Sequence, residues 1–157
     1  MEVETTKHIL HCHEAGRLEA FHATADCLDS CMGEMETDLD LAEILSEFVH
    51  ERVSELMETI CFGRPSRFSA LVHSQDTIGW KRLLEGMVSV EIATLQQQHL
   101  QVSGSRISIN GWMTGLIIKL LEITHGQWLY RNAMVHDSTT VTLITKIRDE
   151  IQLEIER

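Results

Sequence analysis

The chain has 157 residues, of which 43% are hydrophobic and only one is proline, and its formal net charge is −11 at pH 7. This length suits one domain with a sizeable core, and the apolar content excludes a disordered chain. The acidic balance argues against a protein that wraps nucleic acid over its whole surface, because phosphate contacts need clustered Lys and Arg. The composition therefore predicts a folded, helix-rich single domain.

The negative charge is concentrated in the N-terminal part of the chain. Residues 1–60 contain fifteen acids and three bases, a balance of −12, whereas residues 61–157 contain nine acids and ten bases, a balance of +1. Between residues 61 and 84 a single acid, Asp76, accompanies four bases, which predict a small RNA-binding patch: Arg64, Arg67, Lys81 and Arg82. So few charges are also typical of a solvated loop and helix start, and the sequence favours that second interpretation.

Four cysteines, Cys12, Cys27, Cys31 and Cys61, occur without a secretory signal, and no apolar run reaches the roughly 20 residues of a membrane span. We therefore expect free thiols in an intracellular protein, cytoplasmic or nuclear, with neither a membrane nor a small-molecule cofactor among its partners. Cys27 and Cys31 are one helical turn apart and, with His22, offer three metal ligands. A structural zinc site usually needs four, so no metal site is expected.

Periodic apolar residues predict the first helices. Over residues 14–35 they recur at steps of three and four, which indicates one buried seam: Leu18, Phe21, Ala25, Leu28, Met32 and Met35. Residues 37–40 supply N-cap chemistry for a second helix with its own stripe: Leu41, Ile44, Leu45, Phe48, Arg52, Leu56 and Ile60. Gly63 and Pro65 then break the pattern, and a short helix is expected over residues 67–73.

Two longer helices are predicted for the middle of the chain. Ser74 and Asp76 can cap the first, whose apolar face contains Trp80, Leu84, Met87, Glu91 and Leu95, and whose polar tail, residues 96–98, is expected to be exposed. Residues 102–110 are predicted to form a connecting loop, although their alternating apolar residues also allow a hairpin. Asn110 then caps a helix of about 25 residues with this inner face: Met113, Ile117, Leu120, Leu121, Thr124 and Trp128.

A final helix completes the predicted fold. Residues 137–139 are expected to cap it, and its seam contains Val141, Ile144, Arg148, Ile151 and Ile155. The sequence thus predicts an all-α domain, a single bundle of about five antiparallel helices over residues 14–157, preceded by a tail of residues 1–13.

The segment 125–137, HGQWLYRNAMVHD, concentrates the chemically versatile side chains. If it is helical, His125, Trp128, Asn132 and His136 follow one another at steps of three and four and line one stripe. Such a stripe mixes aromatic surface with hydrogen-bonding groups. It fits a functional site, and it equally fits polar residues that satisfy one another and fix the register of the bundle.

The hexapeptide RNAMVH, residues 131–136, resembles the Arg-polar-x-x-x-His motif of HEPN domains, which are helical bundles of similar length. The resemblance implies a metal-independent endoribonuclease, usually built across a dimer, with Arg131, Asn132 and His136 as catalytic residues. In that chemistry a 2′-hydroxyl attacks the adjacent phosphate, His136 moves a proton and Arg131 binds the phosphorane. On a straight helix, however, Arg131 and His136 are about 140° apart, so joint action requires a helix break or a second protomer.

His8 and Cys12 follow Glu4 and Thr5 near the start of the chain, and residues 128–132 read WLYRN. In this order, and over nearly its whole length, the chain resembles the region that follows the reverse transcriptase domain in non-LTR retroelements. There, His and Cys at the end of a zinc knuckle precede helices that lead to a Trp-x-x-Arg-Asn sequence. The resemblance implies a non-catalytic helical module of a polyprotein, associated with RNA or forming a homodimer. The Cys-x-x-Cys half of the knuckle is missing, so no metal or other cofactor is expected.

Overall fold

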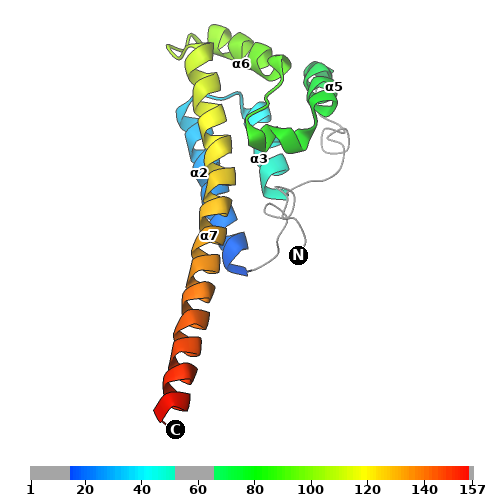
Figure 1. Ribbon diagram of the computed structural model, residues 1–157. Helices are drawn as coiled ribbons and strands as arrows, with labels where there is room; N and C mark the ends of the chain where they lie inside the picture. The colour runs from blue at the N-terminus through cyan, green and yellow to red at the C-terminus, as the bar shows by residue number, and fades with distance from the viewer. Residues whose placement is uncertain (1–14, 52–65, 156–157) are drawn as a thin grey trace.

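The computed structural model describes residues 15–51 and 66–155 (Figure 1). Within these ranges the chain is helical and has no strand, which confirms the predicted all-α bundle of about five helices. The elements are α2 (Ala15–Glu34), α3 (Leu39–Glu51), η1 (Ser66–Phe68), α5 (Ser69–Ile78), η2 (Trp80–Glu85), α6 (Val90–Ser103) and α7 (Ile109–Ile155). The tail of residues 1–13 and the stripe positions Arg52, Leu56 and Ile60 lie outside the described residues.

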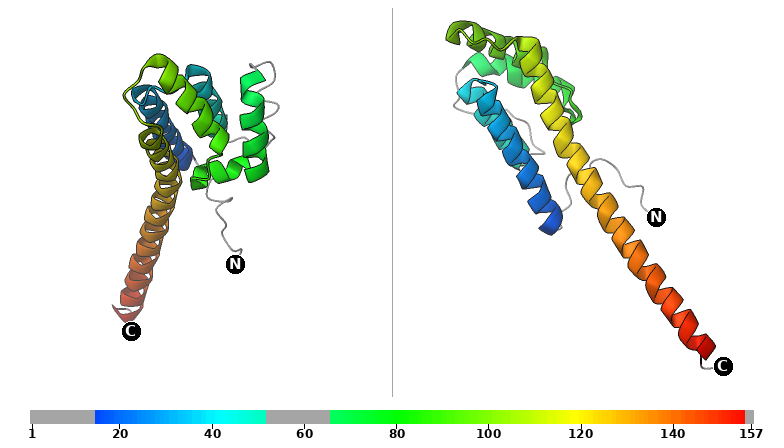
Figure 2. Two further views of the ribbon diagram at one scale, coloured as in Figure 1. Left: turned by 90° about the horizontal axis from the view of Figure 1, so that it is seen from above. Right: turned by 90° about the vertical axis from the view of Figure 1, so that its left-hand side faces the viewer.

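Helices α2 and α7 pack side by side and antiparallel, and theirs is the most extensive helix contact in the described fold (Figure 2). A Cβ atom added at Gly115 of α7 would collide with Sδ of Met35, and one added at Gly126 would meet Cγ2 of Thr24 at 3.5 Å. The two contacts are eleven residues apart on each segment, so they define one antiparallel register. In this register Ala15, the first residue of α2, lies opposite position 135 of α7.

Helix α7 therefore continues beyond the start of α2. From residue 136 to Ile155 it extends for about 30 Å, given a rise of 1.5 Å per residue, and this part projects away from the other described helices (Figures 1 and 2). The predicted boundary at residues 137–139 is wrong, since α7 is unbroken from Ile109 to Ile155. Cap-forming residue types end a helix only where the backbone turns, and the sequence has neither Gly nor Pro after Gly126 to favour a turn.

The predicted seams of the first two helices form the centre of the core. In α2, Phe21, Ala25, Leu28 and Met32 are fully buried, while Leu18 and Met35 at the ends are half-buried. In α3 the buried residues are Leu41, Ile44, Leu45, Phe48 and Val49. The Phe48 ring packs on Trp80 of η2, with 4.9 Å between the ring centroids. Each buried Leu, Ile or Phe side chain contributes roughly 1.5–3 kcal/mol by leaving water, so these positions dominate the stability of the bundle.

The predicted inner face of α7 is displaced by one residue. The buried positions are Trp112, Leu116, Leu120, Ile123 and Gln127, and five of the six predicted positions directly follow one of them. One residue corresponds to a rotation of about 100° around the helix. The predicted face turns partly toward η2, because Oγ1 of Thr124 donates a hydrogen bond to the Leu84 carbonyl at 2.7 Å. Leu121 and Trp128, however, are 44% and 47% exposed.

The predicted long helix from Ser74 to Leu95 is wrong. Ser74 and Asp76 lie inside α5, which ends at Ile78 with Gly79 as its C-cap, and a second glycine with a positive φ, Gly86, separates η2 from α6. These residues adopt φ values of 97° and 80°, which side chains with a Cβ rarely accept, so the helix cannot run through them. The predicted short helix after residue 66 is confirmed as η1 and α5, and residues 104–108 form the predicted loop. Ser108, not Asn110, caps α7 by accepting the Gly111 N–H at 3.1 Å.

The turn that follows α2 contains a glutamate in a strained backbone conformation. Glu36 has a φ of 52°, and the turn is closed by hydrogen bonds from Glu36 N–H to the Gly33 carbonyl and from Thr37 N–H to the Met32 carbonyl. The same arrangement ends α6 at Gly104, where the left-handed residue has no Cβ. Glu36 is therefore the position where glycine is conformationally favoured.

We expect Glu36→Gly to raise the free energy of unfolding by about 0.5–1 kcal/mol. Relief of the left-handed strain, roughly 1–2 kcal/mol, outweighs the extra entropy of glycine in the unfolded chain. Urea titration of both variants measures the difference, with Glu34→Gly in the last turn of α2 as the control. The control should lose up to about 1 kcal/mol, because glycine is a poor helix former. A comparable loss in both variants would contradict the argument.

Candidate functional site

The stripe predicted on α7 lies on its solvent-facing side. His125 is two residues after the buried Ile123, which places it about 200° around the helix from the core. The His125 and Trp128 rings are stacked, with centroids 5.6 Å apart and planes 20° apart. His125 and His136 are exposed, and Asn132 is half-buried. A stripe in this position can contact a partner, because the opposite face of α7 is the one that packs on the core of the bundle.

Apolar residues extend this stripe toward the start of α7. Ile118 and Leu121 precede His125 at steps of three and four, and they are 48% and 44% exposed. We define the outer stripe as the six residues Ile118, Leu121, His125, Trp128, Asn132 and His136. Leu129 adjoins it and is 51% exposed. Large hydrophobic side chains exposed in a row on one helix are typical of an interaction surface.

The three residues predicted to be catalytic lie on one continuous helix. Arg131 is half-buried, and its Nη1 atom is 3.5 Å from Oδ1 of Asn132, at the limit of a hydrogen bond. Because α7 has no break between Arg131 and His136, the two positions stay about 140° apart around the helix axis. The structure thus brings Arg131 to Asn132 and supplies no helix break that would turn Arg131 toward His136.

One residue of the predicted basic patch, Arg67, is paired with aspartates. The Arg67 guanidinium donates to both oxygens of Asp38 at 3.1 Å and also bonds Asp40, and it lies 4.6 Å from the centroid of the Phe68 ring. The hydrogen bond to Asp40, reinforced by Asp38, raises the pKa of Arg67 above its ordinary value, so the guanidinium stays charged. Lys81 and Arg82 are exposed on η2, and Arg64 lies outside the described residues.

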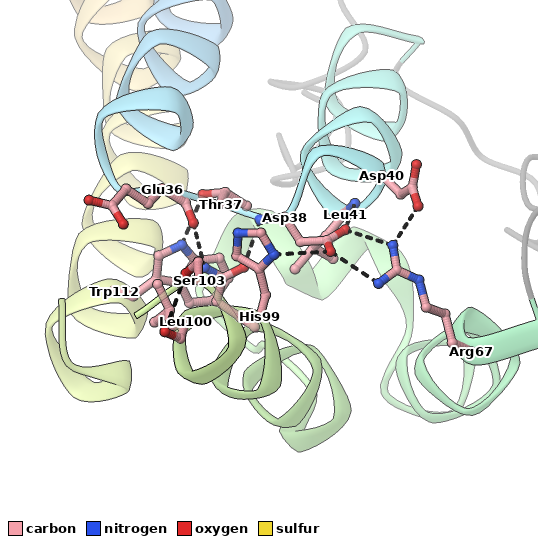
Figure 3. A network of polar contacts seen from close by, with 11 residues as sticks. Glu36, Thr37, Asp38, Asp40, Leu41, Arg67, His99, Leu100, Ser103 and Trp112 are labelled. Atoms are coloured by element: carbon pink, nitrogen blue, oxygen red, sulfur yellow. Dashed lines mark hydrogen bonds and ion pairs between the residues drawn. The ribbon is translucent and has the colours of Figure 1, made fainter. Parts of the chain in front are cut away.

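Asp38 organises a polar cluster where α2, α3 and η1 meet (Figure 3). Its side chain is 8% exposed and accepts the Leu41 N–H at 3.1 Å, which caps α3. Nδ1 of His99 from α6 lies 3.4 Å from the same carboxylate. With the paired guanidinium of Arg67, Asp38 therefore ties the start of α3 to two other elements. These contacts indicate a structural role for Asp38.

Buried amide and hydroxyl groups continue the cluster toward α7. Gln96 accepts the Asp38 N–H at 3.0 Å through Oε1 and donates to the Glu36 carbonyl at 3.0 Å through Nε2. Nε1 of Trp112 donates to Oγ1 of Thr37 at 2.9 Å. The expectation that residues 96–98 form an exposed tail is wrong for Gln96, which is fully buried, while Gln97 and Gln98 are exposed.

The structure also assembles a cluster that sequence spacing did not reveal. His50 of α3 lies against Asp26 and Asp29, which are three residues apart on α2. In the sequence, only the Asp-x-x-Asp spacing of Asp26 and Asp29 could have indicated this cluster, because His50 lies 21 residues beyond Asp29. Cys27 and Cys31 are both free, and the described residues do not gather them with His22 into a three-ligand group.

No protein family, curated protein or solved structure was found to match this chain. In the part of the chain that the structure describes, no helix combines the length and apolar character needed to cross a membrane.

Proposed function

We propose that this chain is a non-catalytic helical module that forms a homodimer through the outer stripe of α7. The observation that carries the proposal is the unbroken 47-residue α7, which bears exposed apolar residues opposite its core face. The resemblance to the C-terminal region of non-LTR retroelement polyproteins supports the same class of function. In that setting, the module joins two copies of a longer protein and associates with RNA held by the assembly.

The projecting part of α7 is an argument that another helix packs against it. A helix of about 20 residues without tertiary contacts is marginal in water, because most helical stability in proteins comes from packing an apolar face. Beyond the start of α2, no described element covers α7 (Figure 2). From His136 the steps of three and four that define the outer stripe continue through Thr140, Leu143, Ile147 and Ile151, of which the last three are apolar. This spacing is typical of helices that pair with another helix.

Charge favours a second copy as the partner. Residues 15–51 contain ten acids and one base, a balance of −9, which would repel an identical surface. Residues 109–155 contain five acids and four bases, a balance of −1. Two α7 helices can therefore approach with little repulsion, and bases and acids of both copies can pair along the contact. The outer stripe itself contains neither a carboxylate nor a lysine or arginine.

Trp128→Glu should convert the dimer to a monomer. A buried tryptophan is a common hot spot of interfaces, and a glutamate in its place would be desolvated without a partner. In sedimentation equilibrium we expect the wild-type chain at twice 17.9 kDa and the variant at 17.9 kDa. Val102→Glu, at a position 90% exposed on α6, adds the same charge and should remain dimeric. A wild-type chain that is monomeric at every concentration would overturn the proposal.

A second candidate function is metal-independent cleavage of RNA by Arg131, Asn132 and His136. The observation that favours it is that His136 belongs to the outer stripe, where a partner copy would lie. Since Arg131 and His136 are about 140° apart on the unbroken α7, each site would combine Arg131 of one copy with His136 of the other. The second candidate therefore depends on the same dimer.

Cleavage of single-stranded RNA in EDTA, leaving 2′,3′-cyclic phosphate ends, is the expected signature of this second function. Arg131→Ala and His136→Ala should each abolish it, because each removes one half of both sites. Mixing the two inactive variants should restore about a quarter of the activity, since half of the dimers are mixed and each has one intact site. Full activity in His136→Ala, or no cleavage by the wild-type dimer, would leave the module non-catalytic.

A further inference from the structure

Three ligand-type side chains converge where α2 and α3 pack together. Asp26 and Asp29 are three residues apart and share a face of α2. Nε2 of His50 lies 2.8 Å from Oδ2 of Asp29 and 3.8 Å from Oδ1 of Asp26. One ligand atom from each residue lies within 4.8 Å of both others. The cluster thus joins one imidazole nitrogen and two carboxylates from two helices.

These separations suit a metal ion. With bonds of about 2.0–2.2 Å to nitrogen and oxygen in a tetrahedral arrangement, the ligand atoms around a zinc ion are roughly 3.3–3.6 Å apart. The distances from Nε2 of His50 to the two carboxylates, 2.8 and 3.8 Å, lie on either side of that interval. Small rotations of Asp26 and Asp29, whose side chains are 73% and 37% exposed, would bring both distances into the interval without moving either helix.

The second oxygen of Asp29 is an independent indication. Oδ1 is shielded from solvent, although the Asp29 side chain as a whole is 37% exposed, and this atom has no hydrogen-bond partner in the described structure. A buried carboxylate oxygen that lacks a partner is unfavourable, because it loses water without a replacement. The hydrogen bond between His50 and Asp29 uses Oδ2 and leaves Oδ1 unsatisfied. A cation bound by both oxygens of Asp29 would satisfy it.

The surroundings of the cluster hold the imidazole in place and attract cations. The ring of His22 stacks on that of His50, with centroids 5.8 Å apart and planes 14° apart. Asp29 also lines an adjacent open cavity of about 630 Å³, together with Met32, Leu39, Ala42, Glu43, Ser46 and Glu47. Three of these seven residues are acidic, so the local potential concentrates positive ions at the cluster.

We propose that Asp26, Asp29 and His50 bind a divalent first-row transition-metal ion such as Zn²⁺. The imidazole selects such an ion over Mg²⁺ or Ca²⁺, which prefer oxygen ligands alone. Three protein ligands leave a position for water, as the partial exposure of His50 and Asp26 allows. The bound ion ties α2 to α3, and it is independent of the dimer contact on α7. The sequence alone predicted no metal site, because these ligands meet only after the helices pair.

The test is titration of the full chain, freed of metal with EDTA, with Zn²⁺ by calorimetry and with Co²⁺ by visible absorption. We expect one equivalent to bind, and Zn²⁺ at a hundredfold excess over Kd to raise Tm by about 5–10 °C. The Co²⁺ spectrum should contain ligand-field bands without a thiolate charge-transfer band, which excludes Cys27 and Cys31. Absence of binding by both ions would overturn the proposal.

Variants locate the bound ion. Asp26→Asn and His50→Ala should each weaken Zn²⁺ binding at least tenfold. Asp26 is mostly exposed, so its variant keeps the fold even if His50→Ala does not. His99→Ala, which removes the imidazole beside Asp38, should leave the affinity unchanged. Unchanged binding in Asp26→Asn and His50→Ala would place the ion elsewhere in the chain and refute this site.

Discussion

Leu28→Asp is expected to unfold the domain. Leu28 is fully buried in the seam of α2 and belongs to the core cluster that also contains residues of α3 and α7, so an aspartate there would be desolvated without a cation to pair with. Loss of the buried side chain, roughly 1.5–3 kcal/mol, adds to the cost of the charge. The expected destabilisation is at least about 3 kcal/mol, a large share of the 5–15 kcal/mol that is typical of a domain.

The matched control is Ala23→Asp in the same helix. Ala23 is exposed, so the variant adds the same charge without desolvating it. We expect a loss of about 0.5–1 kcal/mol, which reflects the lower helix propensity of aspartate. Circular dichroism and urea titration compare the two variants at pH 7. Equal stability of the two would mean that the seam is not the buried face of α2.

The first two helices were predictable because their apolar residues are strongly periodic. Phe21, Leu28 and Met32 recur at steps that only a helix places on one side, and packing then follows from the burial of that side. The start of α3 was predictable for a local reason as well. Asp38 is a good N-cap residue, and its carboxylate does accept the Leu41 N–H.

The orientation of α7 was harder to predict because both of its faces contain large apolar residues. Trp112 is buried and Trp128 is 47% exposed, although the same residue type occupies both positions. Gln127, on the core face, is fully buried, whereas glutamine is usually exposed. Periodicity alone therefore selected the face with Trp128. A helix with two apolar faces is what a module with both a core and a partner requires.

Long-range polar pairs could not be predicted from spacing. Arg67 and Asp38 are 29 residues apart, and the charge pattern of residues 61–84, which allowed an RNA-binding patch but favoured a solvated loop, does not indicate that Arg67 pairs with Asp38. His50 and Asp29 meet only because α3 folds back along α2. Such contacts depend on how the helices pair. A hydrophobic pattern indicates which face of a helix is buried, but it does not indicate which helix that face packs against.

Gln96 belongs to residues 96–98, which the sequence predicted to be exposed, but its side chain is fully buried. A substitution at this position measures what the buried amide contributes to stability. Its amide bridges the Asp38 N–H and the Glu36 carbonyl, two backbone groups at the turn between α2 and α3. The Asp38 N–H is buried, so no water replaces the amide when it is removed. An unpaired buried donor costs about 1–3 kcal/mol, and the loss of the second hydrogen bond adds to this.

Gln96→Leu should therefore lower the free energy of unfolding by about 2–4 kcal/mol, even though leucine has a similar volume and is more hydrophobic. Gln97→Leu is the matched control, because Gln97 is exposed one residue along the same helix and should change stability by no more than about 0.5 kcal/mol. Urea titration of both variants gives the difference, and amide hydrogen exchange at Asp38 reports whether its N–H has lost its partner. We expect exchange at Asp38 to accelerate in Gln96→Leu alone. If Gln96→Leu were as stable as the wild type, the amide bridge would contribute nothing to the turn, and the hydrophobic packing of α2, α3 and α7 would be sufficient to hold it.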